Sequence, residues 1–327
     1  MALSSTDISK AALLALISTF TIVGNLTVSI VLIKYRRLLL KNRPTYQYIL
    51  NLVFSDLVVG LLTMPFEFIS VLHNEWIFGR TVCKMIEFIQ IAASGTTVFS
   101  QALIAFDRYR SLARPYLPKT ETRFVRKMIL MSWIIPAFVS SPYLYMFEIS
   151  HVDSKILCSP NAIPIKWLDT IYEALEFVIG MFLPFLAFCW CYFRVARMFR
   201  GSPLVSPDSV FTRQLSVTFK KKKRVTRTAG LVAVTFTVCW LPTSIMNFVR
   251  VVSGTDRVHS GHLLHQIAMF CAFLNGAINP IVYCAFDRNI KETLSLRQLA
   301  ICKFDDDIRN SRKVSGRKRT SSPSYHD

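Results

Sequence analysis

Charged side chains are scarce in this sequence. Only 18% of its 327 residues are Asp, Glu, Lys or Arg, whereas 52% are hydrophobic, and the mean hydropathy is +0.38. Four stretches contain no charged residue at all: 11–33, 128–147, 228–249 and 263–286. Each is long enough to span a membrane, because a helix needs about 20 mostly apolar residues to cross a hydrocarbon core about 30 Å thick. The composition excludes an ordinary soluble domain.

Three further stretches carry at most one acid each: 45–66, 85–106 and 177–193. Together with the first four they predict seven crossings, and hence an all-α membrane protein whose seven-helix bundle occupies residues 11–286. The first stretch is much longer than the core of a signal peptide and lacks a basic leader. We therefore expect it to be an uncleaved first span.

Acidic residues are outnumbered, with 20 Asp and Glu against 39 Lys and Arg. The net charge of +19 would suit nucleic acid, but the basic residues follow the topology instead. The alternate loops 34–43, 108–127, 194–227 and 288–319 hold 5, 7, 10 and 10 of them. The positive-inside rule places these loops in the cytosol. We expect a plasma-membrane protein with residues 1–10 extracellular, a cytosolic C-terminus, attraction to anionic membrane lipids and no nucleic-acid partner.

Few cysteines are accessible from outside the cell. Of eight, only Cys83 and Cys158 fall on the predicted extracellular side, where an oxidising environment permits that one pair to bridge. Cys302 follows the last span among basic and apolar residues. It is a candidate for palmitoylation, and a free cytosolic thiol is the alternative.

Polar residues inside the predicted spans recur at helical spacing. An ionised side chain at mid-membrane costs roughly 2.5 to 3.5 kcal/mol on insertion scales, so such residues face the bundle interior. Residues three, four or seven apart share one helix face. The third span has a stripe of Glu87, Gln90, Ser94, Thr97, Gln101 and Arg108. The second span has Asp56, Thr63 and Glu67, and the seventh has Asn275, Asn279 and Tyr283. They converge on a common interior, although bonding between helices is an alternative role for any single Ser or Thr.

Short motifs in these spans occur in an order typical of one receptor family. They are "GNL" with Asn25, "NLVFSDL" with Asp56, "WIFGRTVC" ending at Cys83, "DRY" at Asp107 to Tyr109, Trp133, Pro184, "FTVCWLP" with Phe236, Trp240 and Pro242, and "NPIVY" from Asn279 to Tyr283. The sequence resembles rhodopsin-like (class A) G-protein-coupled receptors, most closely the neuropeptide receptor group. The resemblance implies a receptor that catalyses no reaction, requires no cofactor and activates a heterotrimeric G protein when its sixth helix moves outward.

The resemblance also implies which residues connect the ligand cavity to the G protein. Asp107 pairs with Arg108 in the inactive form, and the freed Arg108 meets the G protein; merely basic flanking sequence is the alternative. The implied coupling residues are Asp107, Arg108, Tyr109, Tyr192, Phe236, Trp240, Pro242, Asn279, Pro280 and Tyr283. In many relatives an acid near the start of the sixth helix also holds this arginine, but that region is "KKKKR" here, Lys220 to Arg224. We therefore predict measurable ligand-independent signalling.

Two features of the bundle interior bear on the resting state: a group of oxygen-bearing side chains around Asp56, and Gln101. Asp56, Thr97, Asn275 and Asn279 resemble the internal sodium site of the family, whose oxygen ligands suit a hard cation, and the resemblance implies an allosteric sodium ion. A protonated Asp56 bonded to the asparagines is the alternative. Gln101 departs from the family, since relatives usually carry an apolar residue there that seals the upper cavity from the cytosolic half.

Missing residues narrow the ligand class. The seventh span has no lysine for retinal, and Gln90 stands where receptors for amines usually carry an aspartate. Gln90 resembles a choice among neuropeptide receptors, because an amide both donates to and accepts from a terminal carboxamide. The predicted ligand-binding residues are Gln90, Glu87, Glu67, Glu173, Glu176, Asn247, Trp240 and His265. We expect a short amidated peptide with a basic residue, which carboxylates bind well; an amine or another small molecule is the alternative.

The remaining segments lie outside the membrane. Residues 148–158 are expected to form a hairpin lid, residues 287–300 an amphipathic eighth helix on the membrane surface, and residues 301–327 a basic, Ser-rich cytosolic tail. Basophilic receptor kinases would phosphorylate that tail and favour arrestin, whereas a disordered, lipid-bound tail is the alternative. The sequence has no lysine for retinal in the seventh span and no internal repeat, and both absences disfavour a seven-helix transporter or pump. No nucleophile, base and third partner stand at catalytic spacing, so we expect no enzyme.

Overall fold

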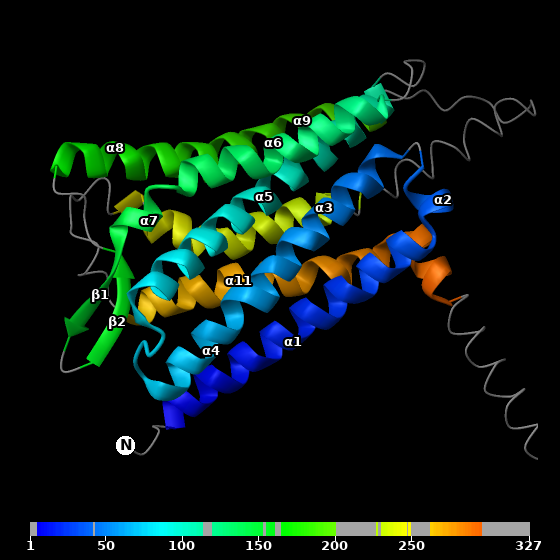
Figure 1. Ribbon diagram of the computed structural model, residues 1–327. Helices are drawn as coiled ribbons and strands as arrows, with labels where there is room; N and C mark the ends of the chain where they lie inside the picture. The colour runs from blue at the N-terminus through cyan, green and yellow to red at the C-terminus, as the bar shows by residue number, and fades with distance from the viewer. Residues whose placement is uncertain are drawn as a thin grey trace, which may run out of the picture.

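The computed structural model describes residues 5–41, 43–113, 120–152, 155–160, 165–200, 227, 230–246, 248–249 and 262–295. Within these residues, six helices are long and apolar enough to cross a membrane, and a further apolar helix, Gly230–Met246, is shorter. They run side by side along one long axis (Figure 1). The predicted all-α membrane bundle of seven spanning helices is confirmed.

Each span is one helix or a stack of helical segments, and short helices mark the turns. In chain order the elements are α1 (Ser5–Lys34), α2 (Arg36–Leu39), α3 (Pro44–Val58), the π-helix η1 (Val59–Thr63), α4 (Met64–His73), α5 (Gly79–Ala113), α6 (Thr122–Ser140), α7 (Tyr143–Met146), β1 (Phe147–Val152), β2 (Lys155–Pro160), α8 (Lys166–Phe177), the π-helix η2 (Val178–Phe182), α9 (Leu183–Arg200), the helix Gly230–Met246, and α11 (His262–Phe286). A last helix covers residues 288–295.

Two predicted spans differ from the observed helices. The fourth helix ends at Ser140, and the apolar residues that follow form α7 and open β1 at Phe147. The fifth begins at Lys166 rather than Phe177, so Glu173 and Glu176 lie within α8. Hydropathy misses these first turns because the acids interrupt the apolar run, although one helix face remains apolar.

The eighth helix is described only in part. Residues 288–295 are helical, with Ile290 and Thr293 buried and Arg288 and Glu292 exposed and paired to each other. Ile290 packs into the apolar core at that end of the bundle. The alternation matches the predicted amphipathic pattern, while residues 296–300 and the tail 301–327 lie outside the described residues.

A β-hairpin covers one end of the bundle, the end at which α1 begins (Figure 1). Strands β1 and β2 are antiparallel, with Ile149 opposite Cys158. A Cys83–Cys158 disulfide connects β2 to α5, as predicted. The backbone N–H of Trp76 donates to the carbonyl of Ile156 at 2.6 Å, so the preceding loop also holds the hairpin.

Glu148 adds an ionic connection between this hairpin and α5. Its carboxylate pairs with Lys84 at 3.1 Å and with Arg80. The hydrogen bond from Lys84 is the main reason that the pKa of Glu148 is lowered below its usual value. Glu148 therefore holds the hairpin in place and does not face the ligand cavity.

Two helix pairs approach closely because a glycine meets a proline. A Cβ at Gly24 of α1 would lie 2.8 Å from the Cγ atom of Pro280 in α11, and one at Gly95 of α5 would lie 2.7 Å from the Cβ atom of Pro136 in α6. Only a residue without a side chain fits such contacts. These contacts allow α1 to pack closely against α11, and α5 against α6.

Candidate functional site

A cavity of about 350 Å³ lies inside the bundle. Its outer part is lined by the hairpin residues Phe147, Cys158 and Pro160, and its inner part reaches Asp56. Helices α3 to α6, α8, Gly230–Met246 and α11 contribute the walls. The predicted convergence of polar stripes on one interior is therefore seen in the structure.

Most of the predicted ligand-binding residues meet in this cavity. Its wall includes Gln90, Glu87, Glu67, Glu176 and Trp240. Glu173 lies about one turn before Glu176 on α8 and is not among the residues that line the cavity. The predicted position Asn247 lies outside the described residues, as does the side chain of His265.

The three glutamates on the wall differ in their surroundings. Glu176 accepts a hydrogen bond from the hydroxyl of Tyr143 at 2.6 Å. Glu67 of α4 and Glu87 of α5 line the same cavity from two different helices. Among the described lining residues there is no Lys or Arg to neutralise them. A cationic ligand would stabilise the ionised form of these buried carboxyls, which no basic side chain of the described lining does.

Sequence reasoning missed Tyr143 and the small polar pair that follows Pro242. Thr243 and Ser244 line the cavity, and the Ser244 hydroxyl donates to the Trp240 carbonyl at 2.8 Å. Tyr143 reaches Glu176 from a different helix, 33 residues earlier in the chain. No local pattern in the sequence signals such a contact.

The inner end of the cavity is built around Asp56, which is 3% exposed. Thr97 donates to one of its carboxylate oxygens at 3.0 Å and the Asn279 amide to the other at 2.9 Å. The side-chain oxygens of Asn275 and Asn279 are buried and have no hydrogen-bond partner among the described residues. A carboxylate with two unpartnered amide oxygens fits the donor set of a hard cation such as sodium.

Aromatic rings connect the cavity to the opposite half of the bundle. Trp240 lies on the cavity wall, and its ring centroid is 6.0 Å from that of Phe236. Phe236, only 1% exposed, meets Phe188 of α9 edge to face at 6.1 Å. A ligand that moves Trp240 would therefore displace packed rings between the sixth and fifth helices.

The other end of α5 carries the predicted Asp107–Arg108 pair. A guanidinium nitrogen, Nη2, of Arg108 lies 2.6 Å from the Asp107 carboxylate, which also accepts a hydrogen bond from Thr45 of α3. The Nε atom of Arg108 is buried without a partner among the described residues, as are the hydroxyls of Tyr192 and Tyr283. The pair is thus intact in this structure, and Arg108 retains unused donor capacity.

Gln101 lies between the two ends and is 3% exposed. Neither its amide nitrogen nor its oxygen has a hydrogen-bond partner among the described residues. An apolar residue at this place would lose nothing, whereas a buried unpaired amide costs about 1 to 3 kcal/mol. Gln101 therefore places an amide without a partner among the described residues where relatives usually carry an apolar side chain.

The seven helices hold an acidic cavity at one end and an arginine paired with an aspartate at the other, and aromatic rings in contact lie between them. This arrangement is that of a membrane receptor. Residues 24–283 match the sequence profile of the 7 transmembrane receptor (rhodopsin family). The chain belongs to this family, whose members are multi-pass membrane receptors and not enzymes.

Several curated relatives cover most of the chain. Galanin receptor 2a of Danio rerio is 28% identical over 294 residues, which are 88% of this chain and 77% of the relative. Substance-P receptor of Homo sapiens is 25% identical over 85% of this chain and 67% of its own. The [Phe13]-bombesin receptor of Bombina orientalis is 27% identical over 79% and 68%. The predicted family and its neuropeptide group are confirmed.

Proposed function

We propose that this chain is a plasma-membrane receptor for a short amidated peptide with a basic residue and that it activates a heterotrimeric G protein. The N-terminus would be extracellular and the C-terminus cytosolic. The observation that carries the proposal is the cavity wall, where Glu67, Glu87 and Gln90 meet without a basic residue among the described lining. The names of the relatives, which refer to galanin, substance P and bombesin, agree with a peptide ligand.

The wall matches two chemical groups of such a peptide. A guanidinium or ammonium group placed between Glu67 and Glu87 would pair with their carboxylates, which have no basic neighbour in the described cavity wall. The oxygen of Gln90 is buried and has no partner among the described residues, so it is available to accept from a terminal carboxamide. Binding above Trp240 would then shift the aromatic contact with Phe236 and move the sixth helix outward, away from Arg108.

A screen of amidated peptides against cells that express the chain tests this proposal. Each active peptide is compared with its free-acid form on wild type and on the Gln90→Leu variant. We expect the wild type to prefer the amide by at least about tenfold, because the lost hydrogen bond leaves a polar group unpaired. In Gln90→Leu that preference should shrink. Activation by amines with no response to any peptide would contradict the proposal.

We further propose that sodium binds beside Asp56. Asp56, Thr97, Asn275 and Asn279 would hold it through oxygen atoms, and its charge would offset the desolvation of the carboxylate. Agonist affinity is measured in a sodium salt and in the salt of a bulky organic cation. In wild type we expect affinity to be severalfold lower in sodium, because coupling between two binding sites typically changes affinity by about 5-fold or more. Asp56→Asn should remove this dependence while the receptor still melts cooperatively. An unchanged sodium effect in that variant would contradict the site.

Partners of the cytosolic tail are proposed from the sequence alone. Ser315, Thr320, Ser321, Ser322 and Ser324 lie among basic residues and would be phosphorylated by receptor kinases, after which arrestin would bind. Palmitoylation of Cys302 would attach the chain to membrane lipids. Cys302 and these tail residues lie outside the described residues.

A further inference from the structure

The first turn of α3 presents two buried polar side chains next to each other. The helix begins at Pro44, whose fixed backbone angle suits a first helical position. The backbone N–H of Tyr46 donates to the carbonyl of Arg43 at 3.2 Å, which closes the turn. Thr45 and Tyr46 are only 1% and 4% exposed. Their hydroxyl groups therefore depend on partners inside the bundle.

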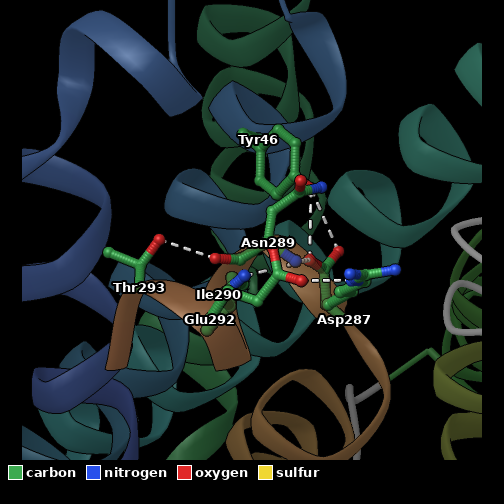
Figure 2. Close-up of polar contacts among 7 residues, drawn as sticks. Tyr46, Asp287, Asn289, Ile290, Glu292 and Thr293 are labelled. Carbon is green, nitrogen blue, oxygen red and sulfur yellow. Dashed lines mark hydrogen bonds and ion pairs between the residues drawn. The ribbon is translucent and has the colours of Figure 1, made fainter. Parts of the chain in front are cut away.

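Tyr46 binds the junction between α11 and the helix 288–295. Its hydroxyl lies 3.2 Å from each carboxylate oxygen of Asp287, to which it donates, and it accepts from the Asn289 side-chain amide at 2.6 Å. Figure 2 shows these contacts at the turn between the two helices. One hydroxyl group thus bridges the residue that precedes the helix and a residue of its first turn.

The junction also has hydrogen bonds of its own. The Oδ1 atom of Asp287 accepts from the backbone N–H groups of Asn289 and Ile290, at 2.9 and 3.2 Å, so Asp287 caps the helix (Figure 2). Ile290 packs into the same apolar core as Tyr46. The cap orders the start of the helix locally, whereas the hydroxyl of Tyr46 fixes that start to a different helix of the bundle.

Thr45 makes the second contact of the turn. Its hydroxyl donates to the Asp107 carboxylate, which also pairs with Arg108 at 2.6 Å. Thr45 and Tyr46 are adjacent residues of one hydrogen-bonded helical turn, so a displacement of one backbone carries the other with it. The helix 288–295 and Asp107 are therefore both held by the same turn of α3.

We propose that this turn of α3 links the position of the helix 288–295 to Asp107, with Tyr46 as the positioning residue. While Tyr46 holds the junction and Thr45 holds Asp107, the pair between Asp107 and Arg108 stays in place. A movement of the helix 288–295 is passed through Tyr46 and Thr45 to that pair. The inference rests on the proposed coupling to a G protein, which would contact the released Arg108.

A cycle of melting temperatures tests the link without a G protein or a ligand. Thr45→Val removes the contact with Asp107, and Asn289→Ala removes the contact with Tyr46 but keeps the backbone N–H that Asp287 caps. We expect the two shifts in melting temperature to be non-additive by about 2 °C or more. In receptors that also carry Tyr46→Phe, the same two shifts should become additive, because the hydroxyl that links the contacts is gone.

Basal nucleotide exchange tests the consequence for the receptor. It is measured on a purified G protein without ligand, in membranes that contain equal amounts of receptor. We expect Tyr46→Phe to raise the basal rate about fivefold, because Asp107 loses part of its support. The control Tyr48→Phe removes the hydroxyl of another buried tyrosine of α3, one that makes none of these contacts, and should leave the rate at the wild-type value.

Asn289→Ala breaks the same contact from the other side and should raise the basal rate in the same direction, so the test remains decisive if Tyr46→Phe does not fold. A basal rate that is unchanged or lowered in the folded variants, or shifts in melting temperature that are additive with Tyr46 present, would overturn the proposal. If wild type activates no G protein with any ligand, the coupling fails, whereas the melting cycle still decides whether the turn of α3 links its two contacts.

Discussion

Arg108→Ala is expected to reduce ligand-stimulated nucleotide exchange to the level of membranes without receptor, while ligand affinity changes by less than about threefold. Arg108 is the last residue of the polar stripe of α5 and lies at the end of the bundle opposite the cavity. Its side chain pairs there with Asp107 at 2.6 Å. Once released, it is the buried cation that a G protein would contact. The measurement is exchange on purified G protein at saturating ligand, with ligand affinity determined in the same membranes.

Arg110→Ala provides the matched control, because it removes an identical charge two residues later, on a different face of α5. It should retain most of the wild-type exchange. Equal losses in the two variants would mean that only the general basic character of this segment matters. That result would contradict the assigned role of Arg108.

Glu67→Gln and Glu87→Gln should each weaken binding of the activating basic peptide by about 30-fold or more. Truncating one partner of a buried charge pair typically costs about 2 to 5 kcal/mol, and these two acids have no basic neighbour in the described cavity wall to compensate for them. Each substitution keeps the shape of the side chain and removes only the charge. Affinity is measured by competition on intact cells.

A peptide in which citrulline replaces the arginine tests whether the charge is the cause. Wild type should prefer the arginine peptide strongly, and the preference should nearly vanish in either variant. Glu148→Gln is the control receptor, because Glu148 pairs with Lys84 and Arg80 outside the cavity. If the arginine and citrulline peptides lose affinity equally in Glu67→Gln, Glu67 supports the fold and does not recognise the charge of the ligand.

The structure separates residues that local pattern could find from those it could not. Glu67, Glu87 and Gln90 were predictable because a charged or amide side chain in an apolar span has few favourable directions other than inward. Glu173 lies outside the cavity wall, which the sequence did not reveal because the start of α8 was not visible in hydropathy. Tyr143 was missed because its contact with Glu176 depends on how α7 packs beside α8.

Asp287 illustrates the same limit at the other end of the bundle. Its sequence context, "FDRNI", indicates a helix cap and little more. Its burial and its bonds to Tyr46 join positions 241 residues apart, and only the packing of α3 against the end of α11 creates them. The absence of an acid near the sixth helix, in contrast, was evident from composition.

The amino-acid sequence by itself determined the class of fold, the number of spans and the inward direction of the costly polar residues. It could do so because transfer of charge and unpaired backbone into lipid is expensive enough to dictate local pattern. Only the tertiary structure decided which acids line one cavity, which are already bonded, and that the carboxylate at the end of α11 meets the hydroxyl of Tyr46. Those outcomes depend on distances of a few ångströms between separate helices, which no periodicity along one chain specifies.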